Sequence, residues 1–196
     1  MVWCEQGQGC YQASLKEPGV MAEKVNVCHG HAPRKFIYEC NMTCGCNMTC
    51  GNRVVQRGMK LKVGVFWTGS KGWGVRTFEA IPKGGFVFEY VGEICSSAEL
   101  ITRHEETALH GCYTLDLNAD WKSEAGVSDA NALCVDGFCF GNVGRFVNHR
   151  CEDANLVDFP VRIERSDPRL YHVAFFAKRN IHALEELTWV ISHALF

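Results

Sequence analysis

The pattern of apolar and polar positions changes once along the chain, near residue 53. Up to Asn52 the apolar residues have poor periodicity, and cysteines are abundant instead, as in CNMTCGCNMTCGN. From about Val54, short β-branched and aromatic runs alternate with glycine and polar clusters, which is typical of strands joined by turns. The pattern therefore predicts a cysteine-rich module over residues 1–52, followed by a strand-rich body.

Most of the predicted elements in the body are strands. The helix candidate is SAELITRHEETAL, residues 97–109, with Ser97 as its N-cap and glutamates following. The polar stretch NADWKSEAGVSDANA, residues 118–132, predicts a surface loop. The predicted fold class is mainly β with few helices, and its clearest strand runs are LKVGVFWTG, FVFEYVGEI, CYTLDL and YHVAFFAKR.

Composition and charge narrow the function classes. The chain has 196 residues, 47% hydrophobic, which is enough for one sizeable core. A formal charge of −2 argues against binding nucleic acid mainly by phosphate neutralisation, whereas a basic peptide partner is easily accommodated. The N-terminus lacks the features of a signal peptide, and no run reaches the ~18 apolar residues of a membrane span. We therefore expect an intracellular protein.

The cysteines predict a metal site. Of the twelve, seven lie in the first fifty residues, and the run CNMTCGCNMTC places four within eleven residues. Spacing this tight cannot form unstrained disulfides throughout, and it suits tetrahedral zinc. Two zinc ions that share one bridging thiolate need seven sulfur ligands. The candidate ligands are Cys4, Cys10, Cys28, Cys40, Cys44, Cys46 and Cys50.

Two further stretches have a structural and a functional interpretation. SKGWGVRT, residues 70–77, is either a tight turn that opens a strand or a place where glycines beside Trp73 let the backbone approach a ligand. RFVNHRC, residues 145–151, is either a strand end with a satisfied core histidine or part of a site. Buried Asn148 and His149 would persist only with partners or a ligand.

Taken together, the motifs resemble the SET-domain histone lysine methyltransferases, most of all their plant Su(var)-related group. The resemblance runs from about Cys28 to Trp189 and implies a knotted β fold over residues 53–189, preceded by an incomplete pre-SET zinc module over residues 1–52. It rests on these stretches in this order: ECNMTCGCNMTCGNRVVQRG, KGWGVRT, FEYVGEI, YTLDL, GNVGRFVNHRCEDAN, YHVAFFAKRNI and EELTW.

The resemblance also implies the chemistry. S-adenosyl-L-methionine would bind in one pocket, and the target lysine would enter a narrow channel from the opposite face. The implied substrate is a basic histone tail, at lysine nine of histone H3. The implied setting is nuclear chromatin, with no membrane and no direct sequence-specific nucleic-acid contact. Asp116 and Asp120 either help to attract the basic tail or are ordinary solvated surface acids.

Site residues carry over position by position. The resemblance assigns catalysis to Tyr113, Asn148 and His149, and the substrate channel to Trp189. The implied cofactor contacts are Lys71, Gly72, Trp73, Tyr113, Arg145, Asn148 and His149. A desolvated channel would favour the neutral lysine amine, whose ordinary pKa is about 10.4. Aromatic walls and tyrosine hydroxyls would orient that amine.

The chain departs from the family pattern after EELTW. Val190 and Ile191 stand where the resemblance implies an Asp-Tyr pair with a catalytic tyrosine, so we expect impaired turnover. Residues 190–196 are interpreted as a non-family tail, with the post-SET segment absent. Cys151 is expected to be an orphan thiol because its implied partners are the post-SET cysteines. We expect a fragment or a truncated product.

Two alternatives to an active methyltransferase remain. The first is a catalytically inactive, zinc-dependent chromatin-binding module, which Ile191 favours, whereas the intact KGWG and RFVNH motifs favour retained cofactor binding. The second is a redox-sensing disulfide protein, which would require the N-terminal cysteines to titrate as thiols or bridges without bound metal.

Overall fold

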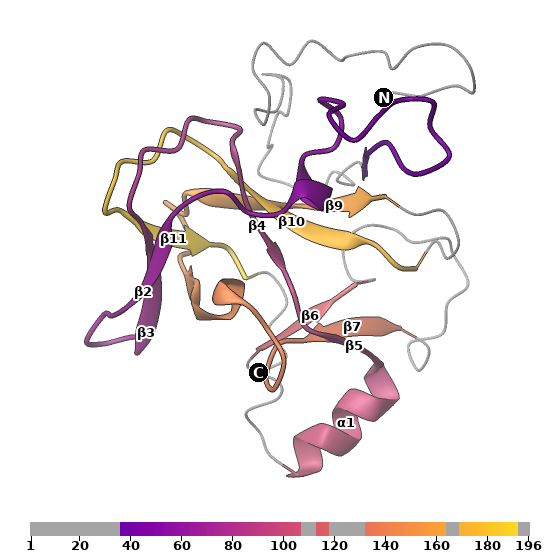
Figure 1. The fold of residues 1–196 in the computed structure, drawn as a ribbon. Coiled ribbons are helices and arrows are strands. Elements are labelled where there is room, and N and C mark those ends of the chain that lie inside the picture. The colour runs from indigo at the N-terminus through magenta and orange to yellow at the C-terminus, as the bar shows by residue number, and fades with distance from the viewer. Residues whose placement is uncertain (1–35, 107–112, 118–131, 164–168, 192–196) are drawn as a thin grey trace.

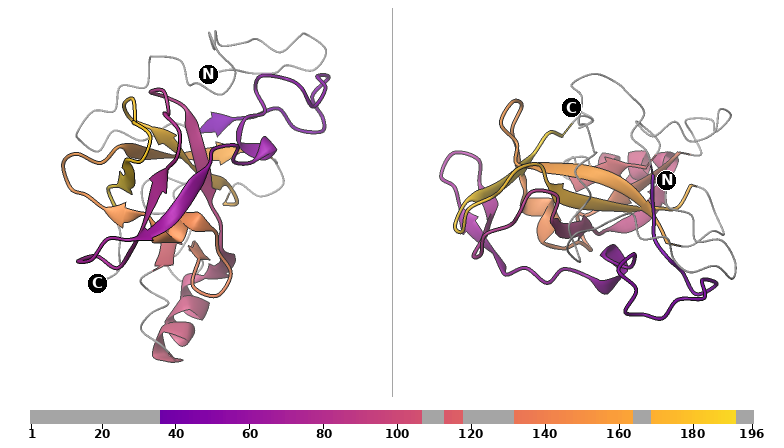
Figure 2. Two further views of the ribbon diagram at one scale, coloured as in Figure 1. Left: turned by 60° about the vertical axis from the view of Figure 1, so that its left-hand side comes forward. Right: turned by 90° about the horizontal axis from the view of Figure 1, so that it is seen from above.

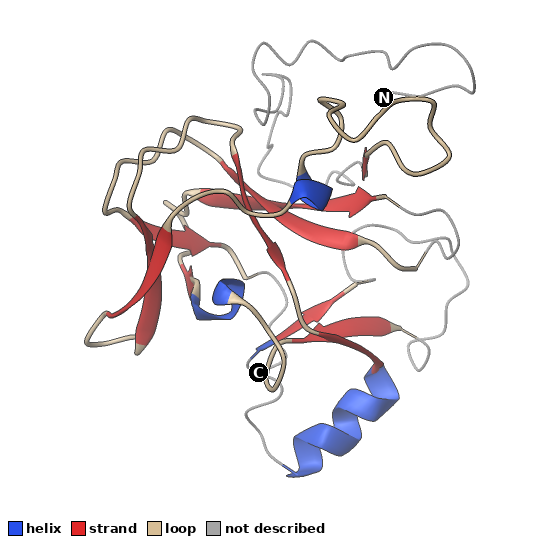
Figure 3. Ribbon diagram, viewed as in Figure 1, coloured by secondary structure: helices blue, strands red, loops and turns tan. Residues whose placement is uncertain are grey.

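Three small β-sheets form the framework of the described chain (Figure 1). The computed structural model describes residues 36–106, 113–117, 132–163 and 169–191. Within these ranges there is one α-helix, and strands dominate (Figure 3). The prediction of a mainly β fold with few helices is therefore confirmed. Cys4, Cys10, Cys28 and nearly all of the predicted loop at 118–132 lie outside the described residues.

The first sheet carries the core. Its strands, in spatial order, are β1 (Ile37–Tyr38), β9 (Leu156–Arg162), β10 (His172–Ala177) and β4 (Phe86–Tyr90). Alternate residues of a strand point to opposite faces. Val173 and Phe175 of β10 accordingly join the larger apolar cluster, whereas Ala174 and Phe176 join a second one. Burial on both faces explains why the β10 run is apolar at nearly every position.

The second sheet brings distant segments together. Its order is β2 (Val63–Trp67), β3 (Trp73–Thr77), β11 (Glu186–Trp189) and β8 (Asn148–His149). β2 and β3 form an antiparallel hairpin, and β11 pairs with β3 on one side. On its other side β11 runs parallel to β8, with Thr188 opposite Asn148 and Trp189 opposite His149. The short helical turn η4 (Val143–Phe146) leads into β8.

The third sheet and the helix lie apart from the β2–β3 hairpin, and α1 forms the lower edge of the molecule in Figure 1 and in the left view of Figure 2. The sheet order is β5 (Glu93–Ser96), β7 (Leu133–Asp136) and β6 (Thr114–Asp116), and α1 (Ser97–Glu106) follows β5 directly.

None of the helical segments in the described ranges combines the length and apolar character that a membrane span requires.

The N-cap prediction for α1 was wrong by one residue. The Ser96 hydroxyl accepts a hydrogen bond from the Glu99 backbone N–H at 3.2 Å, which is the contact of an N-cap with position N3. The Ser97 hydroxyl instead donates to the Ala132 carbonyl oxygen at 3.3 Å. The sequence does not distinguish the two adjacent serines as N-caps. The contact of Ser97 with Ala132, just before β7, leaves Ser96 in the capping position.

A buried amide fixes β11 in place. Asn155 is 1% exposed, and its Nδ2 donates to the Glu186 carbonyl oxygen at 2.7 Å. Its Oδ1 accepts from the Thr188 backbone N–H at 2.9 Å. Nδ2 also donates to Glu185 Oε1, which lies 2.5 Å from Arg179 Nη2. Glu185 therefore supports the amide that holds β11.

This arrangement predicts a pH-dependent contribution to stability. The hydrogen bond from Arg179 lowers the pKa of Glu185 to about 2, against 4.5 ordinarily. A depressed carboxylate pKa stabilises the fold above the unfolded pKa, and this contribution is lost as pH falls from about 4.5 toward 2. Glu185→Gln should lower the free energy of unfolding by about 2 kcal/mol at pH 7. The difference should shrink below pH 4.

Denaturant unfolding of both proteins from pH 7 to pH 3 measures this difference, and comparison at each pH cancels effects common to both. The exposed Glu152, which has no ion pair among the described residues, gives the matched control Glu152→Gln. A Glu185→Gln deficit that stays constant over the whole pH range would contradict the role assigned to the carboxylate.

Candidate functional site

The turn between β2 and β3 has a glycine where a ligand could approach the backbone closely. Gly72 has a φ of +75°, a conformation that L side chains rarely adopt. Its carbonyl oxygen accepts from both the backbone N–H and the hydroxyl of Thr68, each at 2.8 Å. Trp73 is 54% exposed, and its ring packs edge to face against Trp67, with ring centroids 5.4 Å apart. The turn thus holds an accessible indole on a rigid backbone.

The segment at β8 lies against this turn. Lys71 Nζ donates to the His149 carbonyl oxygen at 3.0 Å, across 78 residues of sequence. Asn148 Nδ2 donates to the Trp73 carbonyl oxygen at 3.2 Å and to Glu186 Oε1 at 3.0 Å. The structure therefore brings together five of the predicted residues: Lys71, Gly72, Trp73, Asn148 and His149.

His149 is oriented by the chain that follows β11. Its Nδ1 accepts from the Ile191 backbone N–H at 2.9 Å. A neutral ring that accepts at Nδ1 carries its proton on Nε2, which lies 3.0 Å from Cys151 Sγ. Cys151 is expected to lack cysteine partners, and among the described residues it forms no disulfide and lies outside the cysteine cluster. The bend after β8 places its thiol beside the imidazole instead.

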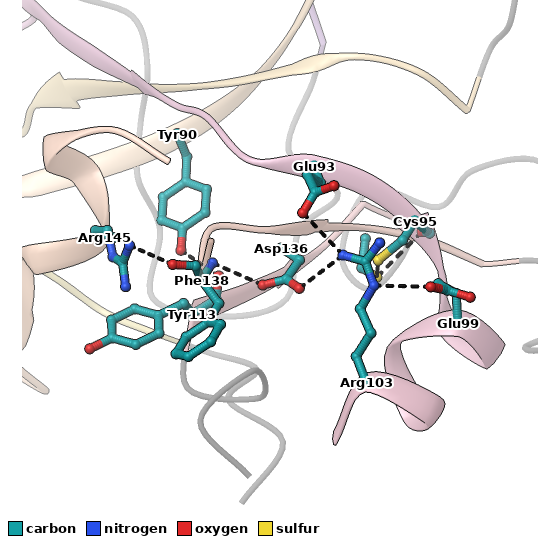
Figure 4. A network of polar contacts seen from close by, with 10 residues as sticks. Tyr90, Glu93, Cys95, Glu99, Arg103, Tyr113, Asp136, Phe138 and Arg145 are labelled. Atoms are coloured by element: carbon teal, nitrogen blue, oxygen red, sulfur yellow. Dashed lines mark hydrogen bonds and ion pairs between the residues drawn. The ribbon is translucent and has the colours of Figure 1, made fainter. Parts of the chain in front are cut away.

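Arg145 and Tyr113 form a second group, shown in Figure 4. The Arg145 guanidinium carbon lies 4.4 Å from the centroid of the Tyr113 ring, and Nη1 donates to the Phe138 carbonyl oxygen at 2.6 Å. The Tyr90 hydroxyl donates to the Tyr113 carbonyl oxygen at 2.6 Å. Burial raises the pKa of Tyr90, so this donor stays protonated. The chain from Arg145 to His149 links the two groups.

Trp189 is placed differently from these residues. It is only 6% exposed, and its ring packs edge to face on Phe175 with centroids 4.9 Å apart. The ring belongs to the larger apolar cluster, as do neighbouring side chains of β10 and β4. Any part it plays at a channel is therefore that of a fixed wall.

The sequence motifs did not reveal several residues that build the site. Thr68 anchors the turn, Glu186 accepts from Asn148, and Tyr90 holds the Tyr113 backbone. Glu186 lies in EELTW and Tyr90 in FEYVGEI, so the motifs contain these residues but do not indicate their contacts. Only the tertiary pairing of strands shows which atoms these side chains reach.

Three cysteines form a candidate metal centre. The sulfur atoms of Cys40, Cys46 and Cys50 lie within 4.8 Å of one another. Cys44 is turned toward Asn41, whose backbone N–H lies 3.4 Å from its sulfur. The other predicted ligands, Cys4, Cys10 and Cys28, fall outside the described residues.

The repeated CNMTC sequence is also a structural repeat. Asn41 Oδ1 accepts from the backbone N–H of Thr43 at 3.0 Å, and Asn47 Oδ1 accepts from that of Thr49 at the same distance. Each asparagine thus forms a side-chain turn that presents the cysteine after it. Buried Glu39 then attaches the region to the body by accepting from the backbone N–H groups of Val54, Val55 and Gln56.

Two plant proteins are similar to this chain in sequence. Histone-lysine N-methyltransferase SUVR4 of Arabidopsis thaliana is 51% identical over 164 residues, which are 83% of this chain and 33% of that protein. The probable inactive histone-lysine N-methyltransferase SUVR1 of the same plant is 49% identical over 172 residues, 86% of this chain and 23% of that protein.

A solved structure matches in three dimensions as well. The complex of KRYPTONITE with mCHH DNA, an H3(1–15) peptide and SAH matches with a TM-score of 0.65 at 32% identity, over 84% of this chain and 30% of that one. The chain spans a third or less of each of these three proteins. The family model of the SET domain matches residues 72–190, more than half of the 196 residues, and the chain therefore belongs to the SET-domain family.

Proposed function

We propose that this chain carries the catalytic fold of a histone-lysine N-methyltransferase, with lysine nine of histone H3 as the target and with impaired turnover. The observation that carries the proposal is the contact between the Lys71–Trp73 turn and the Asn148–His149 segment. These are the residues that the family resemblance assigns to S-adenosyl-L-methionine, and they meet although they are distant in sequence. Membership of the SET-domain family supports the same assignment.

The atoms at this contact fit an amino-acid group with one positive and one negative end. Asn148 Nδ2 donates to the Trp73 carbonyl oxygen and to Glu186. Its Oδ1 accepts no hydrogen bond from the described residues, and an amide oxygen of this kind can accept one from an ammonium. Lys71 supplies a cation for a carboxylate. When bound, S-adenosyl-L-methionine supplies a methyl group on a positively charged sulfur. SAH in the KRYPTONITE complex supports this choice of cofactor.

Tyr113 and Trp189 are the proposed walls of the lysine channel. Arg145 covers one face of the Tyr113 ring and fixes the plane of that ring. The Trp189 ring has little freedom because the core holds it against Phe175. Rigid aromatic walls would exclude water, which favours the neutral amine, and would limit the space around its nitrogen.

The proposed partner is a basic histone tail in nuclear chromatin. The H3 peptide in the KRYPTONITE complex supports a histone tail as substrate. That complex also contains DNA, so the expectation that this chain makes no direct sequence-specific nucleic-acid contact stays a prediction. The net charge of −2 supports the peptide as the principal partner.

An inactive chromatin-binding module is the second candidate, and one residue favours it. Ile191 stands where the resemblance implies a catalytic tyrosine, and its side chain packs against the larger apolar cluster. Isoleucine can neither donate a hydrogen bond nor carry a proton. The name of SUVR1, probable inactive, supports this candidate.

Restoring the hydroxyl separates the two candidates. Ile191→Tyr keeps the backbone N–H that donates to His149 Nδ1, and it adds a positioned phenol. Methyl transfer to an H3 tail peptide should therefore rise by about 10²- to 10⁴-fold. Transfer from radiolabelled S-adenosyl-L-methionine measures the rate, and calorimetric titration of the cofactor measures its binding independently.

Ile191→Phe is the matched control, because it adds the ring without the hydroxyl and should leave the rate at the parent level. Cofactor binding without transfer in the parent chain, with gain only in Ile191→Tyr, is the expected result. Cofactor binding with no gain in Ile191→Tyr would favour the inactive module, and absence of cofactor binding would overturn the proposed function.

We also propose zinc at the cysteine cluster. Zinc–sulfur bonds of about 2.3 Å in a tetrahedron place sulfurs about 3.8 Å apart. The sulfurs of Cys40 and Cys50 lie 3.9 Å apart, close to that spacing. Cys44, Cys4, Cys10 and Cys28 are the proposed further ligands, and the whole set would hold residues 1–52 as a pre-SET module before the SET domain of residues 53–189.

Loss of one clustered thiol should release metal and destabilise the protein. Cys46→Ser should lower the zinc content per chain and the midpoint of thermal unfolding, because structural zinc contributes directly to folding free energy. Atomic emission and calorimetry measure the two quantities. Exposed Cys139, outside the cluster, provides the control Cys139→Ser. Equal zinc content in both variants would argue against the cluster as the metal centre.

A further inference from the structure

Arg103 of α1 is the centre of an ion-pair network that joins the helix to β5 and β7 (Figure 4). Its Nε donates to Glu99 Oε1 at 3.0 Å. Its Nη1 lies 3.3 Å from both Glu93 Oε2 and Asp136 Oδ2. The Asp136 side chain is completely buried, and a buried carboxylate persists only when it is paired and hydrogen-bonded.

Asp136 connects Arg103 to the turn that follows β7. Its second oxygen, Oδ1, accepts from the Phe138 backbone N–H at 2.9 Å. The carboxylate thus joins the helix at one oxygen to the backbone of the turn at the other. The turn over residues 136–138 therefore depends on a residue of α1.

The same turn holds Tyr113 and Arg145. The Gly137 backbone N–H donates to the Tyr113 carbonyl oxygen at 3.0 Å. The Phe138 carbonyl oxygen accepts from Arg145, and the Phe138 ring lies 6.1 Å from the ring of Tyr113. Arg145 covers Tyr113 at 4.4 Å. Tyr113 is thus positioned by its backbone and by two neighbours, and all three contacts depend on residues 136–138.

We infer that Arg103 and Asp136 are positioning residues, which set the geometry of Tyr113 and Arg145 in the proposed cofactor site. Neither residue has a role in the motifs that assign that site. The inference rests on the proposed function for its effect on cofactor binding, whereas the geometric part stands on the contacts alone. It connects α1 to a site built from other elements.

Nuclear magnetic resonance tests the geometric part. The Arg145 Nε group is buried, and among the described residues it has no hydrogen-bond partner. Because the guanidinium carbon lies over the face of the Tyr113 ring, the ring current should shift the Nε proton upfield of its ordinary position. Arg145→Lys identifies the signal by removing it. Arg103→Met should move the signal back toward the ordinary position, because the turn loses its anchor.

Two further variants make the test specific. Glu99→Gln removes a charge from the exposed face of α1 and leaves the contact between Arg103 and Asp136, so the signal should stay in place. Arg103→Lys keeps a cation beside Asp136 but lacks the planar fork that reaches three carboxylates. It should fold even where Arg103→Met does not, and should shift the signal in the same direction by less.

Calorimetric titration with S-adenosyl-L-methionine tests the functional part. Arg103→Met, or Arg103→Lys if the former is unfolded, should weaken binding relative to Glu99→Gln, by about tenfold for the methionine variant. An unmoved Arg145 signal in a folded Arg103 variant overturns the inference, and so does a moved signal with unchanged affinity. If the parent protein binds no cofactor, the proposed function fails, while the resonance comparison still decides the geometric part.

Discussion

A two-residue parallel ladder between β8 and β11 holds the site together. It sets Asn148 beside Thr188 and His149 beside Trp189, and it lets the backbone after β11 bind the His149 ring. So short a ladder has little stability of its own. Buried Asn155 compensates by bonding to β11 at two backbone groups, and Glu185 with Arg179 supports that amide. A polar contact outside the site thus maintains the geometry inside it.

The predominance of strands could be predicted because most strands contain runs of β-branched and aromatic residues. β9 was not identified, and Pro160 explains why, since proline is rare in a central strand. Pairing of β9 with β1 starts only at Val161, so the missing N–H of Pro160 faces no partner in that neighbouring strand. The N-cap of α1 was misassigned because Ser96 and Ser97 differ only in their tertiary surroundings.

The motifs predicted which residues belong to the site more successfully than how those residues are held. Lys71 and Asn148 stand in recognisable motifs, and the structure brings their segments together. The anchors could not be inferred in the same way. Arg103 stands in an amphipathic helix where an arginine usually faces solvent, and only the fold reveals the buried Asp136 within its reach. Contacts that join distant elements leave no local signal in a sequence.

The cysteine region and the rest of the described chain also differ in the length of the loops that their contacts close. The turns at Asn41 and Asn47 each close within three residues, and Cys40 meets Cys50 across ten. The contact between Lys71 and His149 closes a loop of 78 residues. Closing a longer loop costs more conformational entropy, and non-local contacts slow folding. The turns of the cysteine region can therefore form from local contacts alone, whereas the contact between Lys71 and His149 requires that strands distant in sequence have already come together.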